Sequence, residues 1–227
     1  DGLFDITSGV LRRAWDFRSG RVPEAAGLQA LLPLIGWPQV EWSRVNAPDR
    51  RIRLPRAGME LDFGGFGKEY AADRAMATLA VAGLRHGFVN LGGDIRVLGA
   101  RSDGGAWRFG IQHPRNAEGT VASVDMTEGA LASSGDYERF FELDGRRYCH
   151  ILDPRTGWPV SSWASVSVTA PACVAAGALS TIAMLKGGEA LAFLATQGAT
   201  YLAVDTALRT FHSELPTAQP FFSGEHE

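Results

Sequence analysis

The sequence predicts an α+β fold with largely antiparallel sheets and packed helices. Three observations support this class. Residues 107–112 and 121–126 alternate apolar and polar side chains, as antiparallel strands do. The dipeptide Asp144-Gly145 separates two strand-like runs and is typical of a two-residue hairpin turn. Residues 69–82 and 173–185 are alanine-rich and helical in pattern, without strict strand–helix alternation.

The remaining elements are expected as follows. Residues 1–17 run into a helix that ends near Trp15 and Phe17, and residues 18–55 form a connector. A short helix is expected at 28–32, strand edges at 40–42 and 51–54, a strand at 87–99 interrupted by glycines at 92–93, a strand at 165–169, a helix at 189–196 and a last strand at 199–204.

The Asp-Gly turn also predicts a register, because a two-residue turn fixes which residues face each other. Leu143 should face Arg146, and Phe141 should face Tyr148. If the ladder continues outward, Asp136 should approach Asp153.

Composition excludes some classes of protein. The 227 residues, 45% of them hydrophobic, suffice for one sizeable core or two small subdomains. The net charge of −3, without a basic run, argues against a nucleic-acid partner. We see no apolar run of the roughly 18 residues that a membrane span needs. Cys149 and Cys173 lie outside metal-ligand spacing and are expected to be small buried hydrophobes.

Two glycine-containing segments are candidates for ligand contact. Residues 62–68 (DFGGFGK) precede a helix, so backbone N–H groups, the helix N-terminus and Lys68 together suit a diphosphate. The alternative is a glycine turn that helix–strand packing requires. In residues 90–94 (NLGGD), the two glycines indicate a bulge or a backbone surface kept clear for a ligand, and Asp94 either contacts that ligand or caps a turn.

The densest concentration of reactive side chains comprises residues 133–138 (SSGDYE) and 150–157 (HILDPRTG). His150 is the natural candidate for a general base, because its ordinary pKa lies near neutrality. Arg155 could hold a phosphate or carboxylate with two hydrogen bonds. The alternative is a simple Pro/Gly turn in which Asp136 and Arg155 form an internal salt bridge.

Taken together, these segments resemble the FAD:protein FMN transferase (ApbE-like) family across nearly the whole chain. Five blocks occur in the family's order. They are residues 2–9 (GLFDITSG, similar to GxFDxTxG), 62–73 (DFGGFGKEYAAD, similar to DxGGxxKGYAxD), 90–94 (NLGGD), 134–139 (SGDYER) and 150–159 (HILDPRTGWP, similar to HxxDPRTGxP).

The resemblance implies an ApbE-like domain over residues 1–227 that uses magnesium and binds FAD as its donor substrate. It would transfer FMN to a threonine or serine hydroxyl of an acceptor flavoprotein and release AMP. An FAD pyrophosphatase that yields FMN and AMP, or a non-catalytic flavin-binding protein, are the alternatives. The implied site residues are His150 and Asp153 for catalysis; Leu3, Phe4, Asp5, Asp62, Lys68, Asp94, Ile151 and Arg155 for the flavin nucleotide; and Gly65, Gly67 and Thr181 for the metal.

The sequence departs from the family pattern in two places. A strand and helix that usually precede the first block are expected to be missing, which leaves the flavin pocket incomplete. In the late metal block, usually ADALxT, residues 176–181 read AGALST, so Gly177 stands where the metal-binding aspartate is expected. Either the metal site is weakened, or a carboxylate comes from elsewhere.

The resemblance also implies a partner and a compartment. The acceptor would be a subunit of a redox complex that binds transiently. The location would be the periplasm or the outer face of the cytoplasmic membrane, with the cytoplasm still open. Membrane association is expected only through a segment that precedes this sequence.

Overall fold

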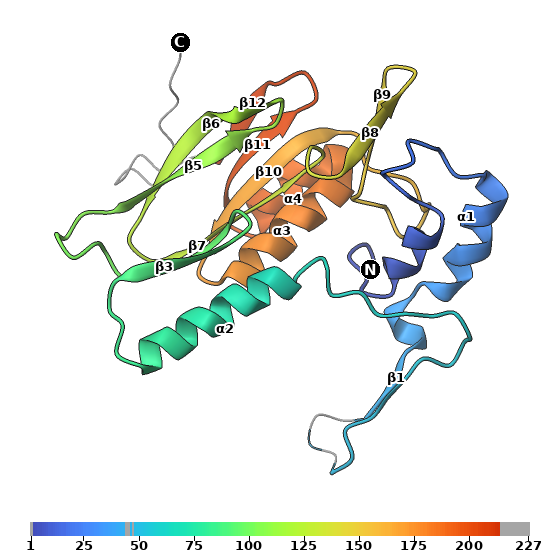
Figure 1. Ribbon diagram of the computed structural model, residues 1–227, viewed down its shortest axis with the longest axis horizontal. Helices are drawn as coiled ribbons and strands as arrows, with labels where there is room; N and C mark the ends of the chain where they lie inside the picture. Colours follow the sequence, from blue (N-terminus) through green and yellow to red (C-terminus); the bar gives the residue numbers. More distant parts are fainter. Residues whose placement is uncertain (1, 44–45, 47, 214–227) are drawn as a thin grey trace. The chain divides into compact units, whose positions relative to one another are not determined.

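The computed structural model describes residues 2–43, 46 and 48–213, and the chain forms two compact units (Figure 1). Unit 1 comprises Asp1–Phe63 and Arg139–Val160, and unit 2 comprises Gly64–Glu138 and Ser161–Glu227. The helices and antiparallel strands confirm the predicted α+β class. The single domain over residues 1–227 stays a prediction.

Unit 1 consists of short helices and two small hairpins around an aromatic core. Its elements are η1 (Ser8–Arg13), α1 (Ala25–Leu31), η2 (Leu32–Leu34), η3 (Trp37–Gln39), β1 (Glu41–Trp42), β2 (Ile52–Arg53), β8 (Phe140–Leu143) and β9 (Arg146–Cys149). The pairing of β1 with β2 confirms the two strand edges expected in the connector.

Trp15 lies at the centre of the unit 1 core. Its ring contacts those of Phe17, Phe141, Tyr148 and Trp158. Its indole N–H donates to the carbonyl of Gly157 at 2.7 Å. The helix expected within residues 1–17 is instead a 3₁₀ helix that spans Ser8–Arg13. Trp15 lies beyond its end and is buried in the core.

The hairpin β8–β9 has the predicted turn and register. Asp144 and Gly145 have φ values of 52° and 72°, the positive values that a type I′ turn requires. Leu143 faces Arg146 and Phe141 faces Tyr148.

The ladder does not continue to Asp136 and Asp153, so the condition for their expected approach is not met. Its last pair is Phe140 and Cys149, followed by one hydrogen bond from the His150 N–H to the Arg139 carbonyl at 3.0 Å. Beyond it the chain folds back on itself, because Leu152 forms a bridge with Pro159.

Unit 2 is built on a six-stranded antiparallel sheet of order β12-β11-β10-β7-β4-β3. Its strands are β3 (Gly87–Leu91), β4 (Asp94–Leu98), β7 (Gly129–Gly135), β10 (Trp163–Ala170), β11 (Thr200–Asp205) and β12 (Thr210–His212), with a separate hairpin of β5 (Trp107–His113) and β6 (Asn116–Met126). Its helices are α2 (Gly67–Val81), α3 (Cys173–Lys186), η4 (Gly187–Glu189) and α4 (Ala190–Thr196). Strands β7 and β12 lie outside the elements that the sequence predicted.

Alternate residues of β7 point to opposite faces of this sheet, as strand geometry dictates. Leu131 packs with Phe109 and Val124 of the β5–β6 hairpin. Ala130 packs with Ala72 of α2 and Cys173 of α3. Figure 1 shows the hairpin on one side of the sheet and the two helices on the other. Unit 2 therefore has two apolar layers, one on each face.

Residues Cys173–Thr196 form a helical stretch long and apolar enough, by length and composition, to cross a membrane. This stretch differs from the expectation that no apolar run is long enough to span a membrane. A core helix passes the same test, and α3 packs against β7 and β10 with Ala176, Ala183 and Met184 fully buried. Packing on the sheet explains the apolar residues of α3 that are buried, which make up part of this stretch.

The glycines at 92–93 form a turn between two strands and not an interruption within one. Gly92 and Gly93 have φ values of 64° and 92°, and Leu91 pairs with Asp94 across them. The bulge interpretation was therefore wrong, because a two-residue glycine turn closes an antiparallel hairpin here. As a result Asp94 begins β4 directly beside the turn.

Candidate active site

Unit 2 brings Lys68 and Asp94 together at the start of α2. The Lys68 Nζ lies 2.6 Å from the Asp94 Oδ2, and the Asp94 side chain is buried. Burial lowers the pKa of Lys68, but the hydrogen bond and charge of Asp94 outweigh it, so its pKa lies above the ordinary value. Lys68 is therefore a fixed positive charge, and 54% of its side chain stays exposed to meet an anion.

The glycine segment before α2 has the predicted form. Gly65 lies in a turn, and Gly67 is the first residue of the helix. The backbone N–H groups of a helix's first turn have no partner within the helix and attract anions. A diphosphate next to Lys68 would meet them, and its binding at this segment stays a prediction.

Thr181 belongs to a group of three hydroxyl side chains. The Ser134 hydroxyl on β7 lies 2.8 Å from that of Ser180 and 2.9 Å from that of Thr181, both on α3. The Ser180 hydroxyl also donates to the Gly177 carbonyl at 3.0 Å. Hydroxyl oxygens are hard ligands that suit magnesium, so this group fits the metal role expected for Thr181.

In unit 1, the buried Asp5 organises its neighbours through its carboxylate. Its Oδ1 accepts hydrogen bonds from the Thr7 N–H (2.8 Å) and hydroxyl (2.6 Å), and its Oδ2 accepts one from the Trp37 N–H (2.8 Å). The Thr7 hydroxyl in turn accepts from the Gly36 N–H at 2.7 Å. Asp5 thus fixes the backbone at the start of the chain, where Leu3 and Phe4 are half-buried.

Asp62 lies beside η1 in a network of charges. Its Oδ2 is 2.9 Å from Arg12, and Glu60 pairs with both Arg12 and Arg13. A Cβ atom at Gly9 would lie only 2.5 Å from the Asp62 Cβ. Gly9 is therefore required for this close approach, which explains the glycine at the end of the first sequence block.

His150 and Ile151 follow β9 in unit 1. Ile151 is buried and His150 is half-buried. The backbone N–H of His150 is bound to Arg139, so the first residue after the ladder is held in place. The structure thus gives the candidate base a fixed backbone position.

Asp153 and Arg155 form one turn. Arg155 donates to the Asp153 carboxylate from its backbone N–H (2.9 Å), its Nε (3.0 Å) and its terminal nitrogen (2.7 Å). Burial raises the pKa of Asp153, but these hydrogen bonds and the guanidinium charge hold it below the ordinary value. Asp153 is therefore ionised at neutral pH, which suits a positioning group, and Arg155 is largely exposed and able to reach an anion.

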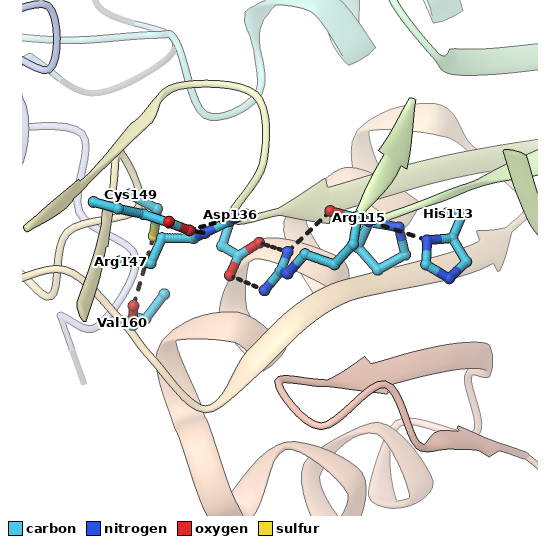
Figure 2. Close-up of polar contacts among 8 residues, drawn as sticks. His113, Arg115, Asp136, Arg147, Cys149 and Val160 are labelled. Carbon is cyan, nitrogen blue, oxygen red and sulfur yellow. Dashed lines mark hydrogen bonds and ion pairs between the residues drawn. The ribbon is translucent and has the colours of Figure 1, made fainter. Parts of the chain in front are cut away.

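Asp136 pairs with Arg115, and the salt bridge to Arg155 that the turn interpretation suggested stays a prediction. Figure 2 shows the Arg115 guanidinium against both carboxylate oxygens, at 2.6 and 2.8 Å. The Arg115 N–H also donates to the Nδ1 of His113 at 3.1 Å. The Arg115–Asp136 pair links the β5–β6 turn to the end of β7, so it stabilises the fold of unit 2.

A sequence profile of the ApbE family matches residues 1–203. The chain belongs to the ApbE family. It is similar to an FAD:protein FMN transferase of Rhodobacter capsulatus (36% identity, covering 83% of this chain and 36% of the relative). It is also similar to one of Klebsiella pneumoniae (34% identity, 71% and 49%). The chain thus spans about half or less of the length of these two relatives.

Solved structures of ApbE proteins have the same fold. The Thermotoga maritima ApbE protein matches with a TM-score of 0.85 at 34% identity, covering 94% of this chain and 71% of that one. The apo flavinyl transferase ApbE of Pseudomonas stutzeri matches with a TM-score of 0.77 at 30% identity, covering 94% and 68%. The ApbE-like fold is therefore confirmed.

Glu69 is a further residue of interest in this ApbE chain, and it was not among the predicted site residues. Only 6% of Glu69 is exposed, and its side chain lies against Gly177. Burial and the Asp94 charge raise the pKa of Glu69. A signal for it was present in the sequence. Glu69 stands where the DxGGxxKGYAxD pattern has the glycine that follows the lysine.

The predicted site residues are therefore divided between the units. Unit 2 contains Lys68, Asp94, Gly65, Gly67 and Thr181, and unit 1 contains Leu3, Phe4, Asp5, Asp62, His150, Ile151, Asp153 and Arg155. Cys149 and Cys173 are buried, as expected, and burial raises the pKa of the Cys173 thiol to about 12.

Proposed function

We propose that this chain transfers FMN from FAD to a threonine or serine hydroxyl of an acceptor flavoprotein, with the help of magnesium. The observation that carries the proposal is the pairing of Lys68 with the buried Asp94 at the N-terminus of α2. A fixed cation beside N–H groups that have no partner within their helix suits the diphosphate of FAD, whose P–O–P linkage this reaction breaks. The activities named for the relatives of this chain support the same reaction.

The residues of unit 2 would act on the diphosphate. Lys68 would place its ammonium against a phosphate oxygen, and the first turn of α2 would donate N–H groups to it. Thr181 and a backbone carbonyl of Gly65 or Gly67 would hold the metal. Magnesium, when bound, would neutralise charge on the phosphoryl group. The oxygen donors of this region fit such a hard cation.

The residues of unit 1 would act on the nucleotide and on the incoming hydroxyl. Leu3, Phe4, Ile151, Asp5 and Asp62 would contact the flavin nucleotide. His150 would accept the proton of the acceptor hydroxyl as its oxygen attacks the phosphorus of the FMN phosphate. The bond between this phosphorus and the bridging oxygen of the diphosphate would break. AMP would leave with the bridging oxygen.

Asp153 and Arg155 would position the reacting groups. Because Arg155 is largely exposed, it can keep its backbone bond to Asp153 while its guanidinium turns to a phosphate. Asp153, held ionised, would keep the turn after His150 in place.

Analysis of the products by chromatography tests the reaction class. The protein is incubated with FAD and magnesium, with and without an acceptor domain that carries a flavinylation threonine. Acceptor-dependent release of AMP without free FMN is expected. Equal release of free FMN and AMP in both samples would indicate a pyrophosphatase, and intact FAD in both would indicate a flavin-binding protein. Either result would refute the transferase.

We further propose that the acceptor is a subunit of a redox complex and that the reaction occurs in the periplasm or on the outer face of the cytoplasmic membrane. The resemblance to the family supports this proposal.

A further inference from the structure

Glu69 has a buried carboxylate oxygen without a partner. Its Oε2 makes no hydrogen bond within the part of the chain that the structure describes, and only 6% of the residue is exposed. An ionised carboxylate in such a place is costly unless a cation or donors compensate it. A bound cation would remove that cost.

The side chain of Glu69 occupies the space that a side chain at position 177 would need. A Cβ atom built on Gly177 would lie 2.6 Å from both the Cγ and the Oε1 of Glu69. The carboxylate of α2 therefore reaches the surface of α3 at the residue where the family pattern has aspartate. The two departures from that pattern, glutamate at 69 and glycine at 177, meet at one point in unit 2.

Glu69 does not belong to a complete metal cage of protein side chains among the described residues. Within residues 2–43, 46 and 48–213, no group of three or more His, Cys, Asp or Glu side chains is placed to hold a metal ion. Magnesium does not need one, because it commonly takes one or two carboxylates together with substrate phosphates and water. Thr181, one helical turn beyond Gly177, adds its hydroxyl on the same helix.

We propose that Glu69 is the carboxylate ligand of the magnesium ion and replaces the aspartate that position 177 lacks. The inference rests on the proposed function, because it assumes that the reaction uses a divalent cation. It explains why a member of this family has glycine at that position: with Glu69 present, a side chain at 177 would collide with it.

A purely structural role for Glu69 is the competing explanation. Glu69 is the third residue of α2, where an acidic or amide side chain stabilises the helix N-terminus. Glu69→Gln separates the two roles, because glutamine keeps the shape and the capping ability but loses the charge that magnesium requires.

The test is a titration with Mn²⁺ in the presence of FAD, in which electron paramagnetic resonance measures the free ion. Glu69→Gln should raise the Kd for Mn²⁺ at least about tenfold, since changes around metal ligands commonly cost that much. Glu189→Gln is the matched control, since the side chain of Glu189 is 82% exposed in the same unit, and it should leave the Kd unchanged. Thermal unfolding with and without Mn²⁺ adds a second readout, because Glu69→Gln should abolish the rise in Tm that the ion causes.

The double variant Glu69→Gly/Gly177→Asp should restore Mn²⁺ binding toward the parental Kd. Parental binding by Glu69→Gln, or no binding by the parent, would overturn the inference. If the parent transfers FMN and Glu69→Gln binds Mn²⁺ normally, only this inference fails. If Mn²⁺ binding depends on Glu69 but no FMN is transferred, only the proposed function fails.

Discussion

The buried carboxylates of this chain differ in how their charge is compensated. Asp136 has the guanidinium of Arg115, Asp94 has the ammonium of Lys68, and Asp5 has hydrogen-bond donors. Only the Oε2 of Glu69, among the buried carboxylate oxygens of the described residues, has no partner. Glu69 therefore differs from the other buried carboxylates in having an oxygen atom whose charge no described group compensates.

Asp153 gives a prediction for acid stability. Its pKa is lowered in the folded protein, so its contribution to stability is present above the ordinary value of 3.8 and is lost as pH falls through the folded pKa. Asp153→Asn should therefore lower the free energy of unfolding at pH 7, with a difference from the parent that shrinks below pH 3.8. Urea unfolding at pH 7 and pH 3 measures this, and an equal difference at both would contradict the assigned ion pair.

His150 gives a prediction for catalysis. His150→Ala should lower the rate of FMN transfer by about 10²–10⁴-fold, the usual contribution of a general base, and leave the Kd for FAD within a few-fold of the parent. His212→Ala is the control, because His212 is an exposed residue of β12. Stopped-flow or quenched assays with fluorescence titration of FAD provide both values. Transfer at the parental rate would exclude His150 as the base.

At the scale of elements, local turn chemistry was predictable and long-range pairing was not. Asp144-Gly145 specified both its turn type and its register, because φ > 0 at both positions selects one geometry. The same logic applies to the turn Gly92-Gly93. The strand-like residues on both sides of it led to the prediction of one strand over residues 87–99, whereas two strands pair across the turn. Strand β7 (Gly129–Gly135) was not predicted because its residues are mostly small and include none of the β-branched or aromatic side chains that are typical of strands.

Gly157 gives a prediction for the turn after His150. Its φ is +75°, and an added Cβ would lie 3.3 Å from Leu28 and 3.4 Å from Leu11 in the aromatic core of unit 1. Gly157→Ala should lower the free energy of unfolding by about 2 kcal/mol or more. Gly104→Ala is the matched control, because its φ is +83° with nothing within 4 Å, and should cost about 1 kcal/mol. Equal losses in chemical unfolding would show that the contacts with Leu28 and Leu11 do not matter.

At the scale of the whole molecule, most candidate site residues could be named from sequence motifs. That one residue could replace another missing from the family pattern could not be predicted in this way. His150, Lys68, Asp94 and Thr181 could be named from their motifs. Glu69 could not, because its meaning depends on Gly177, which is distant in sequence and lies against it only after α2 and α3 pack on the sheet. Residues whose role depends on a local turn can be predicted from the sequence. A residue that replaces another on a different helix can be recognised only when the structure shows that the two positions are in contact.

The central claim is that this chain moves FMN from FAD to a protein hydroxyl, and the intact mass of the acceptor tests it most directly. The protein is incubated with FAD, magnesium and an acceptor domain carrying a flavinylation threonine, and a parallel sample contains EDTA. We predict that the acceptor gains the mass of FMN minus one water, that EDTA abolishes the gain, and that replacing the acceptor threonine by alanine also abolishes it. An acceptor of unchanged mass, with the protein folded and FAD bound, would contradict the account.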